Sequence, residues 1–274
     1  MFKEKDIQMV LVDLDGTLLN DDKKIGKLDY LTLQHLGAIN VKRVFATGRN
    51  LYSALKVLPD DTPFDYLIFS SGAGVMEWKN KELLFQSAIE KKTVNEVLIK
   101  LKELNLNFSI HFPIPENHKY YYHKGNDSST DFDKRNSIYE GFNYELINGF
   151  PLDFATQFIV ILKHESDFHH IASKIEGLKI IRATSPIDGK SVWLEIFNNN
   201  VSKALGGKYL CNMLNIPQIA TIGIGNDYND IDLLNWTSKS YIVDNAPEIL
   251  KKQYLPCASN QNNPLTMVIE KFIN

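Results

Sequence analysis

The strongest constraint in this sequence is an alternation of strand-like and helix-like segments at both ends of the chain but not in its middle. Near the N-terminus, an apolar run over 8–14 is followed by a helix-like segment over 27–40 and a second strand-like run over 41–48. The same order returns in the last third, where a helical pattern over 201–215 precedes an apolar run over 219–226. Strand–helix–strand repeats favour a parallel sheet with helices on both faces. We therefore expect an α/β core built from the two ends of the chain.

The middle of the chain has a different pattern. A helix-like segment over 90–104 is followed by short aromatic strand candidates, such as 106–112, which glycine and proline residues separate. This pattern is typical of an antiparallel α+β module inserted into an α/β domain. We expect residues 1–85 and 190–274 to form the core and residues 86–189 to form the insert.

The composition disfavours several classes of protein. The chain of 274 residues has 30 Lys and Arg against 33 Asp and Glu, so its formal net charge is -3, whereas a protein held to nucleic acid by phosphate contacts is expected to be basic. The two cysteines, Cys211 and Cys257, cannot form a disulfide framework. The N-terminal segment is charged, unlike a signal peptide, and no apolar stretch is long enough to span a bilayer. We expect a cytoplasmic protein without a nucleic-acid or membrane partner; the sequence does not indicate its oligomeric state.

Acidic and turn-forming residues follow the first apolar run, in the order Asp13-Leu14-Asp15-Gly16-Thr17-Leu18. Strand alternation puts Asp13 and Asp15 on one side, at the carboxyl end of the strand, where open α/β sheets build their sites. Two carboxylates this close need a cation, a shared proton or full solvation. Asp13 could attack phosphorus to give an aspartyl-phosphate, while Asp15 protonates the leaving oxygen and later takes a proton from water. The alternative is an acidic turn that caps a helix or binds an adventitious metal.

The segment resembles the first motif of the haloacid dehalogenase superfamily of phosphatases, including the order of nucleophile and acid/base. Three later segments resemble that family's other motifs in the same order: Ala46-Thr47-Gly48-Arg49, Lys203 at the start of a helix, and Gly225-Asn226-Asp227-Tyr228-Asn229-Asp230. The Thr-Gly-Arg form and the insert that follows it are similar to the Cof-type phosphatase subgroup. The resemblance implies a Rossmann-like catalytic core with an inserted α+β cap domain that determines substrate specificity.

The resemblance also implies a role for individual residues. Asp13, Asp15 and Lys203 would be the catalytic groups. The phosphate would be held by five residues: Leu14, Thr47, Gly48, Lys203 and Asn245. The substrate side of the site, towards the cap, would carry three residues: Arg49, Ser71 and Gly72.

A magnesium ion is the implied cofactor. Its ligands would be the Asp13 carboxylate, the Asp15 backbone carbonyl and a third group near residue 226. The family usually has aspartate where this chain has Asn226, and a neutral amide is a poorer magnesium ligand than a carboxylate. Asn226 could bind through its carbonyl oxygen, or a local shift could bring Asp227 to the metal. Support from behind the ligands would come from two residues: Asn229 and Asp230.

The function implied by the resemblance is that of a magnesium-dependent phosphoric monoester hydrolase. Its partners would be small phosphorylated metabolites, with sugar phosphates as the expected class. Two alternatives remain: a phosphotransferase or phosphomutase that uses the same site, and a non-catalytic ligand-binding relative. Retention of Asp13, Asp15 and Lys203 disfavours the non-catalytic alternative. The sequence does not indicate the substrate itself, and we expect the aromatic stretch 111–123 to pack inside the insert rather than to contact substrate.

Overall fold

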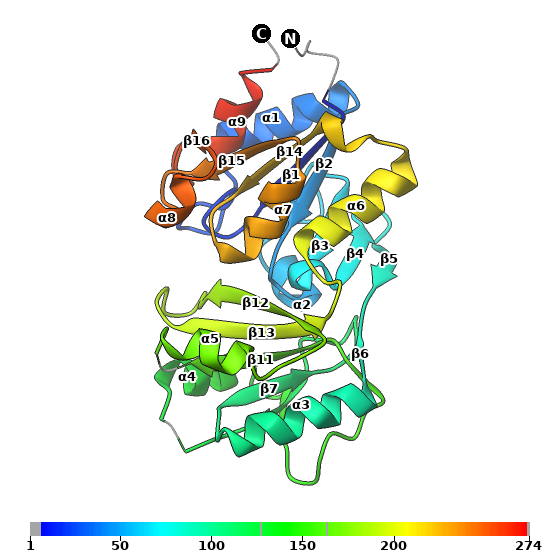
Figure 1. Cartoon of the computed structure of the whole chain (residues 1–274). Helices are drawn as coiled ribbons and strands as arrows, with labels where there is room; N and C mark the ends of the chain where they lie inside the picture. The colour runs from blue at the N-terminus through cyan, green and yellow to red at the C-terminus, as the bar shows by residue number, and fades with distance from the viewer. Residues whose placement is uncertain (1–6, 127, 163, 273–274) are drawn as a thin grey trace. The chain divides into compact units, whose positions relative to one another are not determined.

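The structure is a computed structural model that describes residues 7–126, 128–162 and 164–272. These residues form two compact units (Figure 1). The first, which we call the core unit, contains the chain up to Phe85 and from Ser202 onward. The second, which we call the inserted unit, spans Gln86–Val201.

The second boundary between the units differs from the one expected after residue 189. The structure places it after Val201. The reason is a strand over Val192–Asn198, which pairs on both sides with strands of the inserted unit and not with the core sheet. An almost continuously apolar strand of this kind fits either sheet, so its partner could not be predicted from its own sequence.

The core unit is built on an eight-stranded sheet with β1 near its centre. In spatial order the strands are β16 (Leu255–Cys257), β15 (Lys239–Val243), β14 (Thr221–Gly225), β1 (Met9–Asp13), β2 (Lys42–Ala46), β3 (Tyr66–Phe69), β4 (Gly74–Glu77) and β5 (Glu82–Gln86). The strands from β16 to β3 are parallel, and β4 runs antiparallel to β3. Every residue of β1 is buried, as the continuous apolar run predicts for a strand covered on both faces.

Helices cover both faces of this sheet, which confirms the expected α/β class (Figure 1). They are α1 (Lys27–Ala38), α2 (Leu51–Leu55), α6 (Lys203–Leu214), α7 (Ile231–Trp236), α8 (Glu248–Lys251) and α9 (Pro264–Ile269), with 3-10 turns η2 (Ser70–Gly72), η3 (Gln218–Ala220) and η4 (Tyr228–Asp230). Helices α6 and α7 pack together over Met9 and Leu11 of β1. Helices α1 and α9 pack together, and Asp29 of α1 accepts a 2.8 Å hydrogen bond from the Thr266 backbone of α9.

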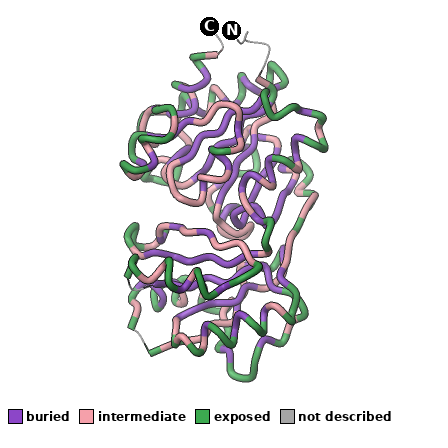
Figure 2. The backbone as a smooth tube through the Cα atoms, viewed as in Figure 1, coloured by how far each residue is buried: buried purple, intermediate pink, exposed green. Residues whose placement is uncertain are grey.

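The inserted unit has a six-stranded sheet of its own. Its strands, in spatial order, are β12 (Leu178–Thr184), β13 (Val192–Asn198), β11 (Gln157–Leu162), β7 (Phe108–His111), β8 (Tyr120–His123) and β9 (Asn143–Glu145). All neighbours are antiparallel except β8 and β9. A separate ribbon pairs β6 (Ile89–Glu90) with β10 (Phe154–Ala155). Figure 2 shows the middle strands of both sheets as buried.

Three helices pack on the sheet of the inserted unit: α3 (Lys91–Glu103), α4 (Thr130–Ile138) and α5 (Asp167–Ala172). Apolar residues of α3 and α5 form one core with the sheet. Helix α4 packs on other sheet residues, through Phe132 and the buried polar residues Asp131 and Arg135. The sequence did not predict α4, because inward-facing polar residues remove the apolar period on which such a prediction depends.

Two expectations from composition can be compared with the structure. Cys211 and Cys257 are free and buried, in different parts of the core unit. Within the ranges that the structure describes, no helix is both long enough and apolar enough to cross a membrane.

Candidate active site

A buried ion cluster lies where β1, α6 and η4 meet. Asp13 ends β1 and is 4% exposed, and Lys203, the first residue of α6, is fully buried. The Lys203 Nζ lies 2.6 Å from Asp13 Oδ1 and 2.6 Å from Asp230 Oδ1. Residues that are 190 positions apart in the chain are therefore in direct contact. The parallel sheet explains this arrangement, because β1 and β14 end at the same edge.

Burial sets the protonation behaviour of this cluster. It raises the pKa of the Asp13 carboxyl to about 7, and the charge of Asp230 acts in the same direction while Lys203 opposes it. Burial disfavours the charge on Lys203, but the Asp13 and Asp230 carboxylates outweigh that effect and raise the pKa of the amine. One cation is therefore shared between two buried carboxylates. A further positive charge near Asp13 would favour its ionised form.

The second oxygen of Asp13 marks a position for such a charge. Asp13 Oδ2 is buried and accepts no hydrogen bond from any residue that the structure describes. A buried carboxylate oxygen without a partner is costly unless a ligand or ion completes it. The described residues contain no group of three or more His, Cys, Asp or Glu side chains suited to a metal. A hard cation at Asp13 would thus depend on carbonyl and amide oxygens as well, and these fit magnesium.

The loop after β14 contains both residues considered as a third ligand. Asp230 Oδ2 accepts hydrogen bonds from the backbone of Asn226 (2.8 Å) and of Asp227 (3.1 Å). The Asp227 side chain accepts in return from the Asp230 backbone, so the two form a capping box around η4. The Asn226 side chain lies against Gly16, where a Cβ atom would be 2.5 Å from its Nδ2. Asn226 is therefore placed beside the loop that carries Asp13 and Asp15, whereas Asp227 is used within its own turn.

Asp15 has a partner that the sequence did not suggest. Arg49 donates two hydrogen bonds to the Asp15 carboxylate, from Nε to Oδ2 at 2.6 Å and from NH2 to Oδ1 at 2.7 Å. Ser53 Oγ accepts from Arg49 NH1 at 2.8 Å, and Lys23 Nζ lies 3.2 Å from Asp15 Oδ1. Burial alone would raise the pKa of Asp15, but Arg49 and then Lys23 lower it below its usual value. Arg49, expected on the substrate side, thus contacts the expected acid/base residue directly.

The loop after β2 lies beside two other expected site segments. Thr47 is buried, and its Oγ1 accepts a 3.1 Å hydrogen bond from the Arg49 backbone, which leaves its hydroxyl proton free to donate. A Cβ atom at Gly48 would lie 3.2 Å from Asn229 Nδ2 and 3.5 Å from Ser71 Oγ. The backbone near Gly48 is therefore enclosed by the side chains of the β14 and β3 loops.

Gly72 and Asn245 contact the backbone of the site. Gly72 has a φ of +103°, and a Cβ atom there would lie 2.0 Å from the Ser202 carbonyl oxygen. Only glycine allows this approach, which sets the start of α6 and thereby the position of Lys203. Asn245 Nδ2 donates to the Gly16 carbonyl oxygen at 2.8 Å, so it holds the loop that follows Asp15. Leu14 is buried between the two aspartates, and its carbonyl oxygen accepts from Leu19 at 2.8 Å.

Sequence reasoning missed the groups that hold these side chains in place. Lys23 and Ser53 belong to no recognised motif. Ser202 directly precedes Lys203 in the segment that resembles the family, but no role was assigned to it; it is the N-cap of α6, and its Oγ accepts from the Leu205 backbone at 3.1 Å. Only Ser202 had a signal, because serine before a helical pattern is a frequent N-cap.

Comparison with known proteins identifies the family to which the sequence is similar. Residues 10–268 match the profile of a family described as haloacid dehalogenase-like hydrolase. A protein of Buchnera aphidicola subsp. Schizaphis graminum that carries a provisional phosphatase name is 25% identical over 269 residues, covering 96% of this chain and 95% of that protein. Two solved structures share the fold. One is a Bacteroides thetaiotaomicron phosphatase of the same superfamily (TM-score 0.78, 17% identity, 97% of this chain and 95% of that chain). The other is a subclass IIB sugar phosphatase (TM-score 0.76, 18% identity, 97% and 98%).

Proposed function

The chain belongs to the haloacid dehalogenase-like hydrolase family and is a phosphatase-type enzyme of that family. We propose that it hydrolyses small phosphorylated metabolites through an aspartyl-phosphate on Asp13, with magnesium as cofactor. The observation that carries the proposal is the state of Asp13: one oxygen is bound by buried Lys203, and the other is buried without a hydrogen-bond partner among the described residues. A carboxylate held in this way is fixed in orientation and shielded from water, as a nucleophile for phosphorus requires.

In the first step, Asp13 attacks phosphorus and the bond to the leaving oxygen breaks. Lys203, the Thr47 hydroxyl and the backbone amides of Leu14 and Gly48 hold the phosphoryl oxygens. Asp15 gives its proton to the leaving oxygen, so the alcohol departs neutral. The Arg49 pair favours ionised Asp15, so this step requires that the pair be weakened when substrate binds.

In the second step, water attacks the phosphorus of the aspartyl-phosphate. Asp15, now ionised, takes a proton from that water, and the carboxylate of Asp13 is released with inorganic phosphate. The Arg49 pair supports this step, because it stabilises the ionised form of Asp15.

The residues present fit a magnesium ion. Asp13 Oδ2, the Asp15 backbone carbonyl and the Asn226 side-chain oxygen would hold it, with Asn229 and Asp230 behind them. When bound, the ion shields the nucleophile from the charge of the substrate and neutralises charge on the transferring group. We favour Asn226 over Asp227 as the third ligand, because the Asn226 side chain lies against Gly16, in the loop that carries Asp15.

Sugar phosphates are the substrate class that we propose. The support is that one structural neighbour is a sugar phosphatase of subclass IIB, and we assign substrate selection to the inserted unit, as the cap of this subgroup. The test is a phosphate-release screen over sugar phosphates, nucleotides and phosphorylated cofactors, with and without magnesium. Release that requires magnesium and is fastest with sugar phosphates supports the proposal. Transfer to a second hydroxyl without net release would instead indicate a mutase.

The acid/base assignment has its own test within this screen. Asp15→Asn should slow release from alkyl phosphates by about 10²-fold or more, because their leaving oxygen needs a proton. Release from p-nitrophenyl phosphate should fall less, since its leaving group departs without one. Equal losses on both substrates, seen only in KM, would contradict the assignment.

A further inference from the structure

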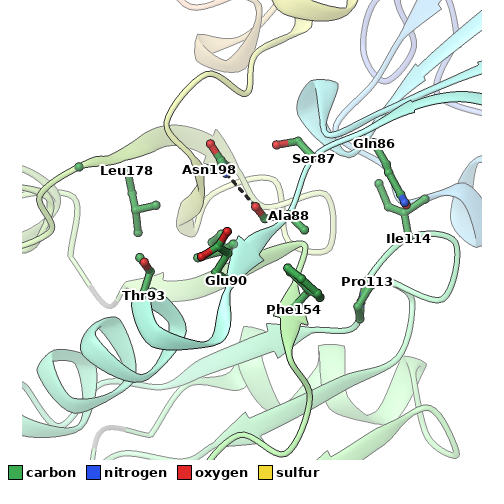
Figure 3. A pocket seen from close by; sticks show the side chains of 12 residues that line it. Gln86, Ser87, Ala88, Glu90, Thr93, Pro113, Ile114, Phe154, Leu178 and Asn198 are labelled. Carbon is green, nitrogen blue, oxygen red and sulfur yellow. Dashed lines mark hydrogen bonds between the residues drawn. The ribbon is translucent and has the colours of Figure 1, made fainter.

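The inserted unit contains a pocket that the proposed reaction does not use. Its volume is about 480 Å³, within the range of small-molecule sites (Figure 3). The pocket is lined by Gln86, Ser87, Ala88, Ile89, Glu90, Thr93, Pro113, Ile114, Phe154, Gly177, Leu178 and Asn198. Two segments of the pocket wall are joined by a hydrogen bond, which Asn198 Nδ2 donates to the Ala88 carbonyl oxygen at 2.8 Å. This bond joins the first and last segments of the unit.

The side-chain charge of the lining disfavours a phosphate ligand. Glu90 is the one charged residue of the lining, and none of the described residues that line the pocket is Lys, Arg or His. The nearest lysine in sequence, Lys91, is engaged elsewhere, because its Nζ lies 3.3 Å from Asp153 Oδ1. Glu90 itself forms no ion pair within the described ranges. The lining offers an anion no positively charged side chain, and the Glu90 carboxylate opposes the attraction of the α3 N-terminus for anions, whereas a cation would find a carboxylate without an ion pair among the described residues.

An aromatic ring lies beside that carboxylate. Phe154 of β10 is directly opposite Glu90 of β6 in the antiparallel ribbon, so both side chains project on the same face. Phe154 is 48% exposed although it is large and apolar. Figure 3 shows both side chains in the pocket wall, on neighbouring strands. A carboxylate next to an aromatic face is an arrangement that attracts an ammonium group.

The remaining lining completes a site for a hydroxylated molecule. Hydroxyl and amide groups are supplied by Ser87, Thr93 and Gln86, and apolar surface by Ile114 and Leu178. We propose that this pocket binds a small unphosphorylated amine that carries hydroxyl groups, such as an amino sugar, with its ammonium between Glu90 and the face of Phe154. This binding site is separate from the phosphoryl-transfer site in residues and in chemistry.

The test uses one sugar ring with three charges. Calorimetry on the full-length protein at about pH 6, where a sugar amine is protonated, compares glucosamine, glucose and glucuronate. Glucosamine should bind about 3- to 5-fold tighter than glucose, because an exposed ion pair contributes modestly, and glucuronate should bind more weakly than glucose. Glu90→Gln should remove the advantage of glucosamine over glucose, and Phe154→Ala should weaken both.

A matched control is Glu103→Gln, at the other end of α3 and outside the pocket, which should bind like the unaltered protein. Asp13→Asn should also leave glucosamine binding unchanged. The proposal is overturned if glucosamine does not bind, if Glu90→Gln and Glu103→Gln have equal effects, or if Asp13→Asn abolishes binding.

Discussion

Both units bury charged side chains, but they satisfy them differently. In the core unit, Asp13 and Asp230 share Lys203, and one oxygen of Asp13 accepts no hydrogen bond from the described residues. In the inserted unit, both oxygens of buried Asp131 are used: Ser185 Oγ donates to one at 2.9 Å and Trp193 Nε1 to the other at 2.7 Å.

The buried Arg135 of the inserted unit also has partners for its charge. Arg135 donates to His111 Nε2 at 3.1 Å and lies 4.4 Å from the centre of the Tyr120 ring. His111 in turn contacts the Asn117 carbonyl oxygen through Nδ1 at 2.7 Å, and burial holds the pKa of this histidine well below its usual range. This buried network is complete and neutral at the histidine, so we interpret it as structural. An incomplete buried carboxylate indicates a site for chemistry, and a complete one indicates a support for the fold.

The largest expected effect separates these two roles. Asp13→Asn should lower phosphate release by about 10³-fold or more, because it removes the nucleophile. The melting temperature should stay the same or rise, since Lys203 keeps Asp230 as its partner and the carboxylate removed is one whose charge burial disfavours. Phosphate release and circular dichroism measure the two quantities. Turnover close to that of the unaltered protein would refute the assigned nucleophile.

In the inserted unit, we expect a substitution of a buried carboxylate to lower stability and to leave turnover largely intact. Asp131→Ala should lower the free energy of unfolding by about 2 to 3 kcal/mol, because Trp193 Nε1 and Ser185 Oγ lose a buried acceptor. Turnover of the protein that remains folded should persist. The matched control is Asp133→Ala, two residues along α4, where an exposed pair with Lys124 should contribute about 0.5 kcal/mol or less. Equal losses in a urea titration would contradict the distinction.

Another buried carboxylate, Asp29 of α1, is hydrogen-bonded but still disfavoured by burial. Burial raises the pKa of Asp29 to about 6, although hydrogen bonds from Thr266 oppose the rise. Asp29 ionises at lower pH in the unfolded chain than in the folded one, so this group makes the protein less stable as pH rises from about 4 to about 6, by about 3 kcal/mol. Asp29→Asn should flatten that fall in unfolding curves, whereas Asp22→Asn, at an exposed position, should not. An unchanged slope in both variants would show that Asp29 ionises normally.

The smallest expected effect concerns the ligand set. Asn226→Asp should tighten magnesium binding by about 10-fold, because a carboxylate replaces a neutral oxygen beside Asp13. Asp227→Asn, which keeps the size of the capping side chain, should bind as the unaltered protein does. Calorimetry with magnesium alone measures both without reference to turnover. If only Asp227→Asn changes the affinity, Asp227 is the ligand.

The sequence was sufficient to predict the strand–helix–strand repeats of the core unit and the site residues that follow the ends of its strands. The apolar run before Asp13 predicted β1, and strand order predicted the edge at which Asp13, Thr47 and Asn226 lie. The sequence could not assign β13 to its sheet, because a strand's partner depends on the rest of the chain.

Contacts made by long side chains were beyond sequence reasoning. The ion pair between Arg49 and Asp15 depends on side-chain rotamers and on Ser53, which lies 38 residues after Asp15. No spacing rule relates these three residues. Helix α4 was missed for a related reason, since Asp131 and Arg135 point inward to partners that lie on other strands.

The most direct measurement is to find which residue carries the phosphoryl group during turnover. The enzyme is mixed with p-nitrophenyl phosphate and magnesium, quenched in acid, digested and analysed by mass spectrometry. We predict a phosphorylated peptide whose modification maps to Asp13 and is absent from Asp13→Asn. A phosphoryl group on another residue, or steady phosphate release by Asp13→Asn, would contradict the account.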